Sequence, residues 1–263
     1  MTESLPDWNE ARTALRNPVY APLAPAFARL PPDRWPTHEE LTTLATGIAT
    51  SRGQALRFIA PRGHTNRERR YYELHIADTG EVETRPENWH DLFNALGWIA
   101  FPKAKAAINA QHVAILEERG EAEAKRRGPE RDALTLFDEG GVVVASDDPR
   151  VSEMIRGFEW KDLFWHHRAE LAGKVRFVAF GHNLFEKMLD PHWGMVTKTI
   201  FVPWAEPFDA DAALAAHFAV RANFASPKTM PPMPVLGVPG WYAETERESF
   251  YDDATHFRGP TPK

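Results

Sequence analysis

Apolar positions recur with helical spacing in the segment that follows Asn88. Leu92, Leu96 and Ile99 are three or four residues apart and would share one face of a helix. Asn88 is a favourable N-cap residue directly before this pattern. The spacing therefore predicts an amphipathic helix over residues 88–101 whose apolar face is turned towards a core.

A second helix is predicted to follow with almost no connection. Pro102 disfavours helical geometry at Phe101 but is well tolerated in the first turn of a new helix. This helix should run to about Arg119 and end at Gly120. Because the connection is so short, we expect the two helices to fold back as a pair.

Two hairpins are predicted where apolar segments adjoin turn-forming residues. Residues 70–76 alternate in character and precede a turn at 78–80. Residues 134–137 and 142–144 are apolar and flank 138–141, whose Asp-Glu-Gly-Gly composition is typical of a tight turn. These segments are expected to supply strands of a small sheet.

A nearly continuous apolar run over residues 175–180 predicts a strand that is buried on both faces. Gly181 then leads directly into a predicted helix over residues 182–189. The remaining predicted elements are a helix that begins at a capping box at Thr37, a strand at 56–60, a charged connector at 117–131, helices at 149–156, 160–172 and 209–220, and a strand at 197–202.

The 22 prolines are concentrated towards the two ends of the chain. Because proline interrupts helices and cannot donate a ladder hydrogen bond, residues 1–36 and 222–263 are expected to be irregular and to wrap a more regular middle. The pattern as a whole predicts a single α+β domain over residues 1–263. Its small mixed sheet with hairpins would be packed by the helical pair and by further helices.

Composition removes several classes of function. The chain has no Cys, which excludes disulfides, thiolate zinc sites, iron–sulfur clusters and cysteine nucleophiles. Its net charge of −6 makes nucleic-acid binding unexpected. The sequence has no glycine-rich phosphate loop, Gly-x-Ser-x-Gly or His-Glu-x-x-His motif, so no nucleotide cofactor is indicated.

The sequence also bears on location and partners. No apolar run approaches the roughly 18 residues of a membrane span. The first residues lack the basic and apolar regions of a signal peptide. We therefore expect a cytoplasmic, soluble protein that acts on a small-molecule substrate, and the oligomeric state stays open.

Side chains capable of chemistry lie within the predicted helical pair. His90, Asp91 and Asn94 are neighbours on one side of the first helix, and His112 and Asn109 lie on the second. A polar group inside a core must be hydrogen-bonded or coordinated, because leaving it unpaired costs about 1–3 kcal/mol. The cluster is thus either a structural polar network or an active site, and helix capping alone would also explain Asp91.

His182 and Glu186 form a second constellation, four residues apart after the predicted strand at 175–180. A crevice at the end of such a strand commonly binds ligands, and both side chains could face one metal ion. The same spacing is equally common in surface hydrogen bonds. Asp132, Asp138 and Glu139 bracket the predicted second hairpin, and the tight turn expected over residues 138–141 would account for Asp138.

Histidines combined with carboxylates, without cysteine, suit a divalent ion such as Zn, Mn or Fe. We therefore hypothesise a metal-dependent hydrolase with His90, His112 and His182 as ligands. Asp91 or Glu186 would be the general base for a metal-activated water. Two alternatives stay open: a metal-free binding or interaction module with a structural polar network, and a non-haem Fe(II) oxidoreductase that uses two histidines and one carboxylate.

Four blocks of the sequence resemble those of a bacterial family known only as domain-of-unknown-function family 3025. They are residues 88–96, 131–139, 180–182 and 236–241, and the resemblance spans roughly residues 20–245. It implies one family-wide domain and no established activity, so it carries over no catalytic role. The candidate residues in or beside the blocks are His90, Asp91, Asn94, His112, Asp132, Asp138, Glu139, His182 and Glu186.

Overall fold

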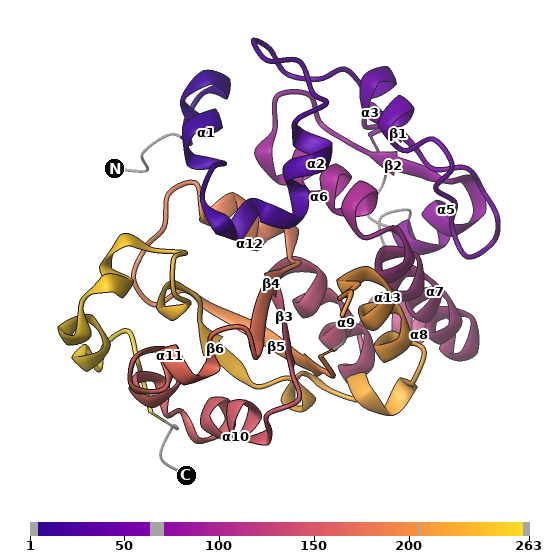
Figure 1. Cartoon of the computed structure of the whole chain (residues 1–263). Helices are drawn as coiled ribbons and strands as arrows, with labels where there is room; N and C mark the ends of the chain where they lie inside the picture. Colours follow the sequence, from indigo (N-terminus) through magenta and orange to yellow (C-terminus); the bar gives the residue numbers. More distant parts are fainter. Residues whose placement is uncertain (1–4, 64–70, 205, 260–263) are drawn as a thin grey trace.

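Helices and two small sheets are combined in the computed structural model, which describes residues 5–63, 71–204 and 206–259. Figure 1 shows helices on several sides of the larger sheet. The α+β class expected from the sequence is confirmed. Within the described ranges, every helix is too short or too polar to cross a bilayer.

The larger sheet has four strands in the order β4-β3-β5-β6. Its central strand, β3 (Gly141–Ser146), pairs antiparallel with β4 (Val175–Ala179) and parallel with β5 (Val196–Val202). The short β6 (Pro232–Pro234) pairs antiparallel with β5. The predicted burial of the 175–180 strand on both faces is wrong, because β4 lies at the sheet edge and most of its residues are only half-buried.

The smaller sheet joins β1 (Arg57–Ile59) and β2 (Glu81–Glu83) in parallel. The strand predicted over residues 70–76 is wrong within the described residues, since α5 (Tyr72–Thr79) is a helix there; residue 70 lies outside them. The helix ends at Gly80, whose φ of 72° is left-handed and whose N–H donates to Ile76 O. The turn signal was thus a helix C-cap.

The two helices predicted over residues 88–101 and from Pro102 to about Arg119 are confirmed with the boundaries that the sequence indicates. Helix α6 (Trp89–Ala100) begins after Asn88, whose side chain accepts a hydrogen bond from Asp91 N at 3.0 Å. Helix α7 (Pro102–Arg119) begins at once and ends at Gly120. Two later helices, α12 (His182–Lys187) and α13 (Ala210–Phe218), pack on α6 and α7 respectively.

The second predicted hairpin is wrong, because helix α9 (Pro129–Gly140) runs directly into β3. Ala133, Leu134 and Phe137 are completely buried, and their spacing of three and four residues forms one helical face. This packing overrides the turn composition of residues 138–141. Consequently Asp138 and Glu139 lie on the last turn of a helix.

Short helices make up the remainder of the described chain, including much of its Pro-rich ends. The capping box at Thr37 is confirmed at the start of α3. The predicted 160–172 helix is divided by a π-helical turn, η2. These elements are α1 (Trp8–Ala14), η1 (Pro18–Leu23), α2 (Ala24–Phe27), α3 (His38–Leu44), α8 (Glu121–Lys125), α10 (Pro149–Gly157), η2 (Asp162–His166), α11 (Arg168–Leu171), η3 (Arg221–Phe224), η4 (Pro227–Thr229), η5 (Val235–Gly237), η6 (Ala243–Glu246) and η7 (Glu248–Asp252).

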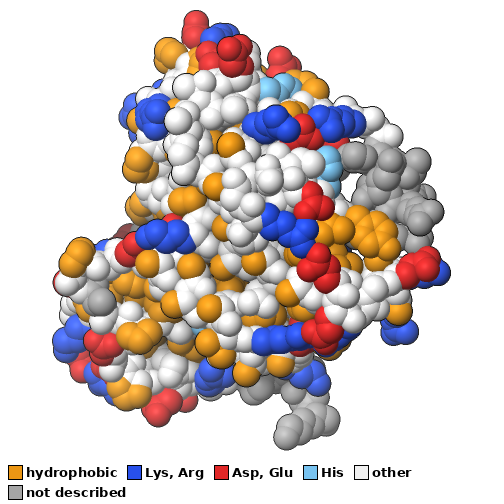
Figure 2. Space-filling model, turned by 90° about the vertical axis from the view of Figure 1, so that its right-hand side faces the viewer, with side chains coloured by type: hydrophobic (Ala, Val, Ile, Leu, Met, Phe, Trp, Pro, Cys, Tyr) orange, Lys and Arg blue, Asp and Glu red, His pale blue; other side chains and the backbone are white. Residues whose placement is uncertain are grey.

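Acidic and basic side chains are interspersed on the face drawn in Figure 2, with apolar side chains scattered between them. Surface ion pairs connect many of the charges elsewhere along the chain, for example Arg221 with Glu118 and Glu130. Exposed pairs of this kind contribute little to stability individually.

Candidate metal site in a polar cavity

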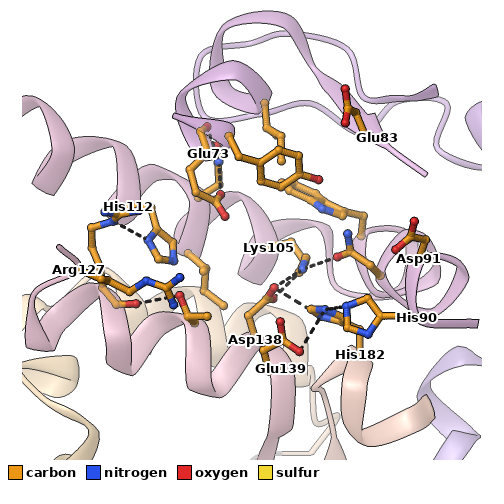
Figure 3. A pocket seen from close by; sticks show the side chains of 18 residues that line it. Glu73, Glu83, His90, Asp91, Lys105, His112, Arg127, Asp138, Glu139 and His182 are labelled. Atoms are coloured by element: carbon orange, nitrogen blue, oxygen red, sulfur yellow. Dashed lines mark hydrogen bonds and ion pairs between the residues drawn. The ribbon is translucent and has the colours of Figure 1, made fainter. Parts of the chain in front are cut away.

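A polar cavity of about 290 Å³ lies among helices α5, α6, α7 and α9 and the start of α12 (Figure 3). Most of its lining side chains carry hydrogen-bonding or ionisable groups. The lining residues are Tyr72, Glu73, Ile76, Glu83, His90, Asp91, Asn94, Trp98, Lys105, Ile108, Asn109, His112, Arg127, Arg131, Thr135, Asp138, Glu139 and His182.

Two histidines from distant parts of the sequence meet at one end of this cavity. His90 Nε2 and His182 Nε2 are 3.2 Å apart, and Glu139 Oε2 lies 3.6 Å from His182 Nε2. One ligand atom from each of the three side chains lies within 4.8 Å of the other two. We call His90, Glu139 and His182 the ligand cluster, because this group could hold a metal ion.

Each imidazole of the ligand cluster has a carboxylate at its opposite nitrogen. His90 Nδ1 is 2.8 Å from Glu186 Oε2, and His182 Nδ1 is 3.6 Å from Asp138 Oδ2. The close Glu186 carboxylate favours the proton on His90 Nδ1, which leaves His90 Nε2 with a lone pair. His182 Nδ1 makes no hydrogen bond among the described residues, and the Asp138 carboxylate is the anion near it. The two Nε2 atoms lie within hydrogen-bonding distance of each other, so one can donate to the other. A bound cation would replace that proton and take both nitrogens and the Glu139 carboxylate as ligands.

Asp138 is fixed in place by a buried lysine. Lys105 Nζ donates to both Asp138 oxygens, at 2.6 and 2.8 Å, and to Asn94 Oδ1 at 2.9 Å. Burial favours the protonated form of Asp138, but the charge of Lys105 and its hydrogen bonds to the carboxylate outweigh burial and hold the pKa of Asp138 below the ordinary value. Asp138 therefore stays an anion behind His182.

Burial shifts the ionisation of two members of the ligand cluster. Burial, reinforced by Lys105 and His90, lowers the pKa of His182 to about 4, so its imidazole is neutral at neutral pH. Burial and the nearby Asp138 raise the pKa of Glu139. The side chains of His90 and Glu139 remain 30% and 37% exposed, so the cluster is reachable from solvent.

The two predicted general bases occupy different positions. Glu186 contacts the rear nitrogen of His90 and does not line the cavity. Asp91 lines the cavity but is held by Arg85, whose backbone N, Nε and Nη2 donate at 2.7, 2.8 and 2.9 Å. Burial opposes ionisation of Asp91, yet these bonds keep its pKa below the ordinary value.

The structure does not bring His112 to the ligand cluster, although it lines the same cavity. Its Nδ1 accepts a hydrogen bond from Arg131 Nε at 3.2 Å. His112 lies seven residues beyond Lys105 on α7, a rise of about 10 Å. That separation carries it towards the opposite end of the cavity, and Glu139 supplies the third donor of the cluster instead.

Other candidates have structural partners or lie elsewhere. Asn109 Nδ2 donates to Glu73 O at 2.8 Å and to Glu73 Oε2 at 2.7 Å, and Asp132 does not line the cavity. Sequence reasoning missed Lys105 and gave Glu139 only a turn role. Lys105 and His112 share a helical stripe on α7, with Asn109 between them, and this stripe was the available signal.

Close packing of Gly181 on the end of α9 sets the geometry of the cluster. A Cβ at this position would overlap the backbone carbonyl of Glu139, and its neighbour His182 begins α12. We expect Gly181→Ala to lower the free energy of unfolding by about 1–3 kcal/mol, as for other overpacked sites. Urea denaturation measures this loss.

Gly97→Ala is the matched control, because a Cβ there meets no atom within 4 Å and the position is helical. Its stability should stay unchanged or rise by up to about 1 kcal/mol. A Gly181→Ala variant as stable as the parent chain would contradict the close approach.

Together, the fold and the cavity define an α+β protein with a candidate metal site between helices. The chain belongs to the family described as "Protein of unknown function (DUF3025)", whose match covers residues 56–260 and confirms the resemblance seen in the sequence. All three residues of the ligand cluster fall within the match. No curated protein and no solved structure matches the chain significantly.

Proposed function

We propose that the protein is a metal-dependent hydrolase in which the ligand cluster holds a divalent ion such as zinc. The observation that carries this proposal is the convergence of two imidazole nitrogens and one carboxylate oxygen, with a further carboxylate near the rear nitrogen of each histidine. Two histidines and one glutamate form a known ligand set for catalytic zinc, in which a fourth position stays open.

The chain's own side chains have distinct tasks in this proposal. Glu186 holds the His90 ring in the tautomer that presents Nε2, and so acts as a positioning residue. Asp138, neutralised by Lys105, has the same task for His182. A divalent ion bound here would lower the pKa of a bound water and polarise the substrate bond.

Asp91 is the proposed acceptor of the water proton. It is the one of the two predicted bases that lines the cavity, and Arg85 keeps its carboxylate ionised and oriented. To accept the proton, Asp91 would exchange one of its hydrogen bonds from Arg85 for one from the water. The substrate would enter through the side where His90 and Glu139 are exposed.

The test compares zinc-loaded and chelator-treated protein on p-nitrophenyl acetate, p-nitrophenyl phosphate and a peptide p-nitroanilide. We expect hydrolysis of at least one probe by the zinc-loaded protein only, and its loss by about 100-fold or more in Asp91→Asn with zinc binding retained. Equal rates with and without chelator, or no bound zinc, would refute the proposal. Absence of any bound metal would leave the metal-free module as the explanation.

A second candidate is favoured by the same donor set. Two histidines and one carboxylate are also the ligands of non-haem Fe(II) enzymes. Anaerobic titration with Fe(II) followed by measurement of oxygen uptake distinguishes the two. Oxygen consumption above that of a His182→Ala control, together with no hydrolysis by the zinc form, would favour an oxidoreductase.

A further inference from the structure

The cavity extends from the ligand cluster to a second end, where His112, Arg127 and Arg131 line it (Figure 3). We call this the arginine end. His112 is buried, and its Nδ1 accepts the N–H of Arg131 Nε. An accepting Nδ1 fixes the neutral tautomer with the proton on Nε2. His112 therefore offers a single N–H donor besides this bond.

No partner takes up that donor among the described residues. His112 Nε2 makes no hydrogen bond there and is not one of the unpartnered atoms that are fully enclosed, so it reaches the cavity. Burial also lowers the pKa of His112, in agreement with the neutral tautomer. An N–H donor that opens into a cavity calls for an acceptor on the ligand.

Arg127 adds an unused cation to the same end. It belongs to the linker between α8 and α9, and its guanidinium forms no hydrogen bond or ion pair with any residue that the structure describes. Arg131 is 7% exposed, and its ion pair with Glu123 is long, at 3.8 Å. The charges of Arg127 and Arg131 repel each other, so an anion between them would stabilise both.

The acidic side chains of the cavity, unlike the donors at the arginine end, already have partners. Each one outside the ligand cluster accepts a hydrogen bond. The pairs are Glu73 with Asn109, Glu83 with the backbone of Arg62, Asp91 with Arg85, and Asp138 with Lys105. At the arginine end, by contrast, two guanidinium groups and the His112 N–H donor line the cavity without a carboxylate that pairs closely with them. This gives the cavity one side suited to a cation and one suited to an anion.

We propose that the arginine end binds an anionic group of the substrate, a carboxylate or a phosphate, while the bond to be cleaved lies at the ligand cluster. The substrate is then a small anionic molecule, in keeping with a cavity of about 290 Å³. Guanidinium groups recognise both oxyanions through paired N–H donors. The placement of the cleaved bond at the ligand cluster rests on the proposed hydrolase function, but the anion site itself needs no metal.

The experiment titrates the chelator-treated full chain with inorganic phosphate and, separately, with succinate, at constant ionic strength, by isothermal titration calorimetry. We expect one or both to bind, and Arg127→Gln to weaken that binding about tenfold or more, because a charge-assisted hydrogen bond is lost. Arg126→Gln is the matched control: Arg126 is the adjacent exposed arginine and does not line the cavity. It should bind as the parent does.

The outcomes separate the two proposals. Binding of phosphate alone or of succinate alone supports the anion site and identifies the group. If neither binds, or if Arg127→Gln and Arg126→Gln affect binding equally, the anion site is refuted. A zinc titration of the same samples tests the hydrolase proposal independently: anion binding without zinc binding would overturn the metal function and leave the arginine end standing.

Discussion

His182→Ala is expected to abolish zinc binding, with a loss of affinity greater than about 100-fold. Residues that only support a ligand contribute about 10–100-fold to metal affinity, and His182 would be a ligand itself. Competition with a chromogenic chelator measures the affinity. The parent chain should also melt at a higher temperature when zinc is added, and the variant should not.

His166→Ala provides the matched control, because this histidine is exposed and its ring pairs with Asp162 and Glu248 at the surface. It should bind zinc with the affinity of the parent. His90→Ala repeats the test at a less buried position, in case the loss of His182 disturbs folding. Zinc affinity that stays within a few-fold of the parent in both cluster variants would refute the metal site.

Lys105→Met is expected to destabilise the chain by about 3–5 kcal/mol, the usual cost of removing one partner from a buried ion pair. Lys105 is 6% exposed, and its ammonium is the cation that neutralises Asp138. Methionine keeps the length of the side chain while removing the charge. Lys103→Met is the control, since Lys103 pairs with Asp209 at the surface and should have little effect.

The loss caused by Lys105→Met should shrink as the pH is lowered. In the parent chain the pKa of Asp138 is below its ordinary value, so the pair stabilises the fold at neutral pH and this contribution declines as acid protonates Asp138. In the variant, burial without Lys105 favours a protonated Asp138, so acidification relieves the strain. Urea denaturation at neutral and mildly acidic pH measures this, and an equal loss at both would contradict the assignment.

The helical pair was predictable because its signals are local. Asn88 caps α6, Pro102 separates the two helices, and Gly120 ends α7. Each of these residues acts on its immediate backbone neighbours, whatever the rest of the fold does. The sequence therefore placed both boundaries correctly, together with the position of His90 at the start of α6.

The end of α9 was not predictable in the same way. Asp138, Glu139 and the two glycines after them have the composition of a turn, and a turn would have sent the chain back as a hairpin. Packing of Leu134 and Phe137 into the core stabilises the helix over the turn. The spacing of these buried residues was visible, but it competed with a strong local turn signal.

The candidate site was predicted in part, since His90, His182 and Glu186 do lie close together. Their contacts depend on how α12 packs against α6, which separate regions of the sequence cannot specify by themselves. Glu139 was missed as a candidate ligand because its helix was missed. His112 lies at the arginine end because seven residues of α7 separate it from Lys105.

The ligand cluster draws on α6, α9 and α12, helices that are widely separated along the chain. Unfolded protein cannot hold these three side chains together, so an ion would bind the native state almost exclusively and would add to its stability. During synthesis, more than ninety further residues must be added after His90 before His182 is present. A metal ion would therefore bind only after the chain has folded, and fragments that end before His182 would bind no ion at this site.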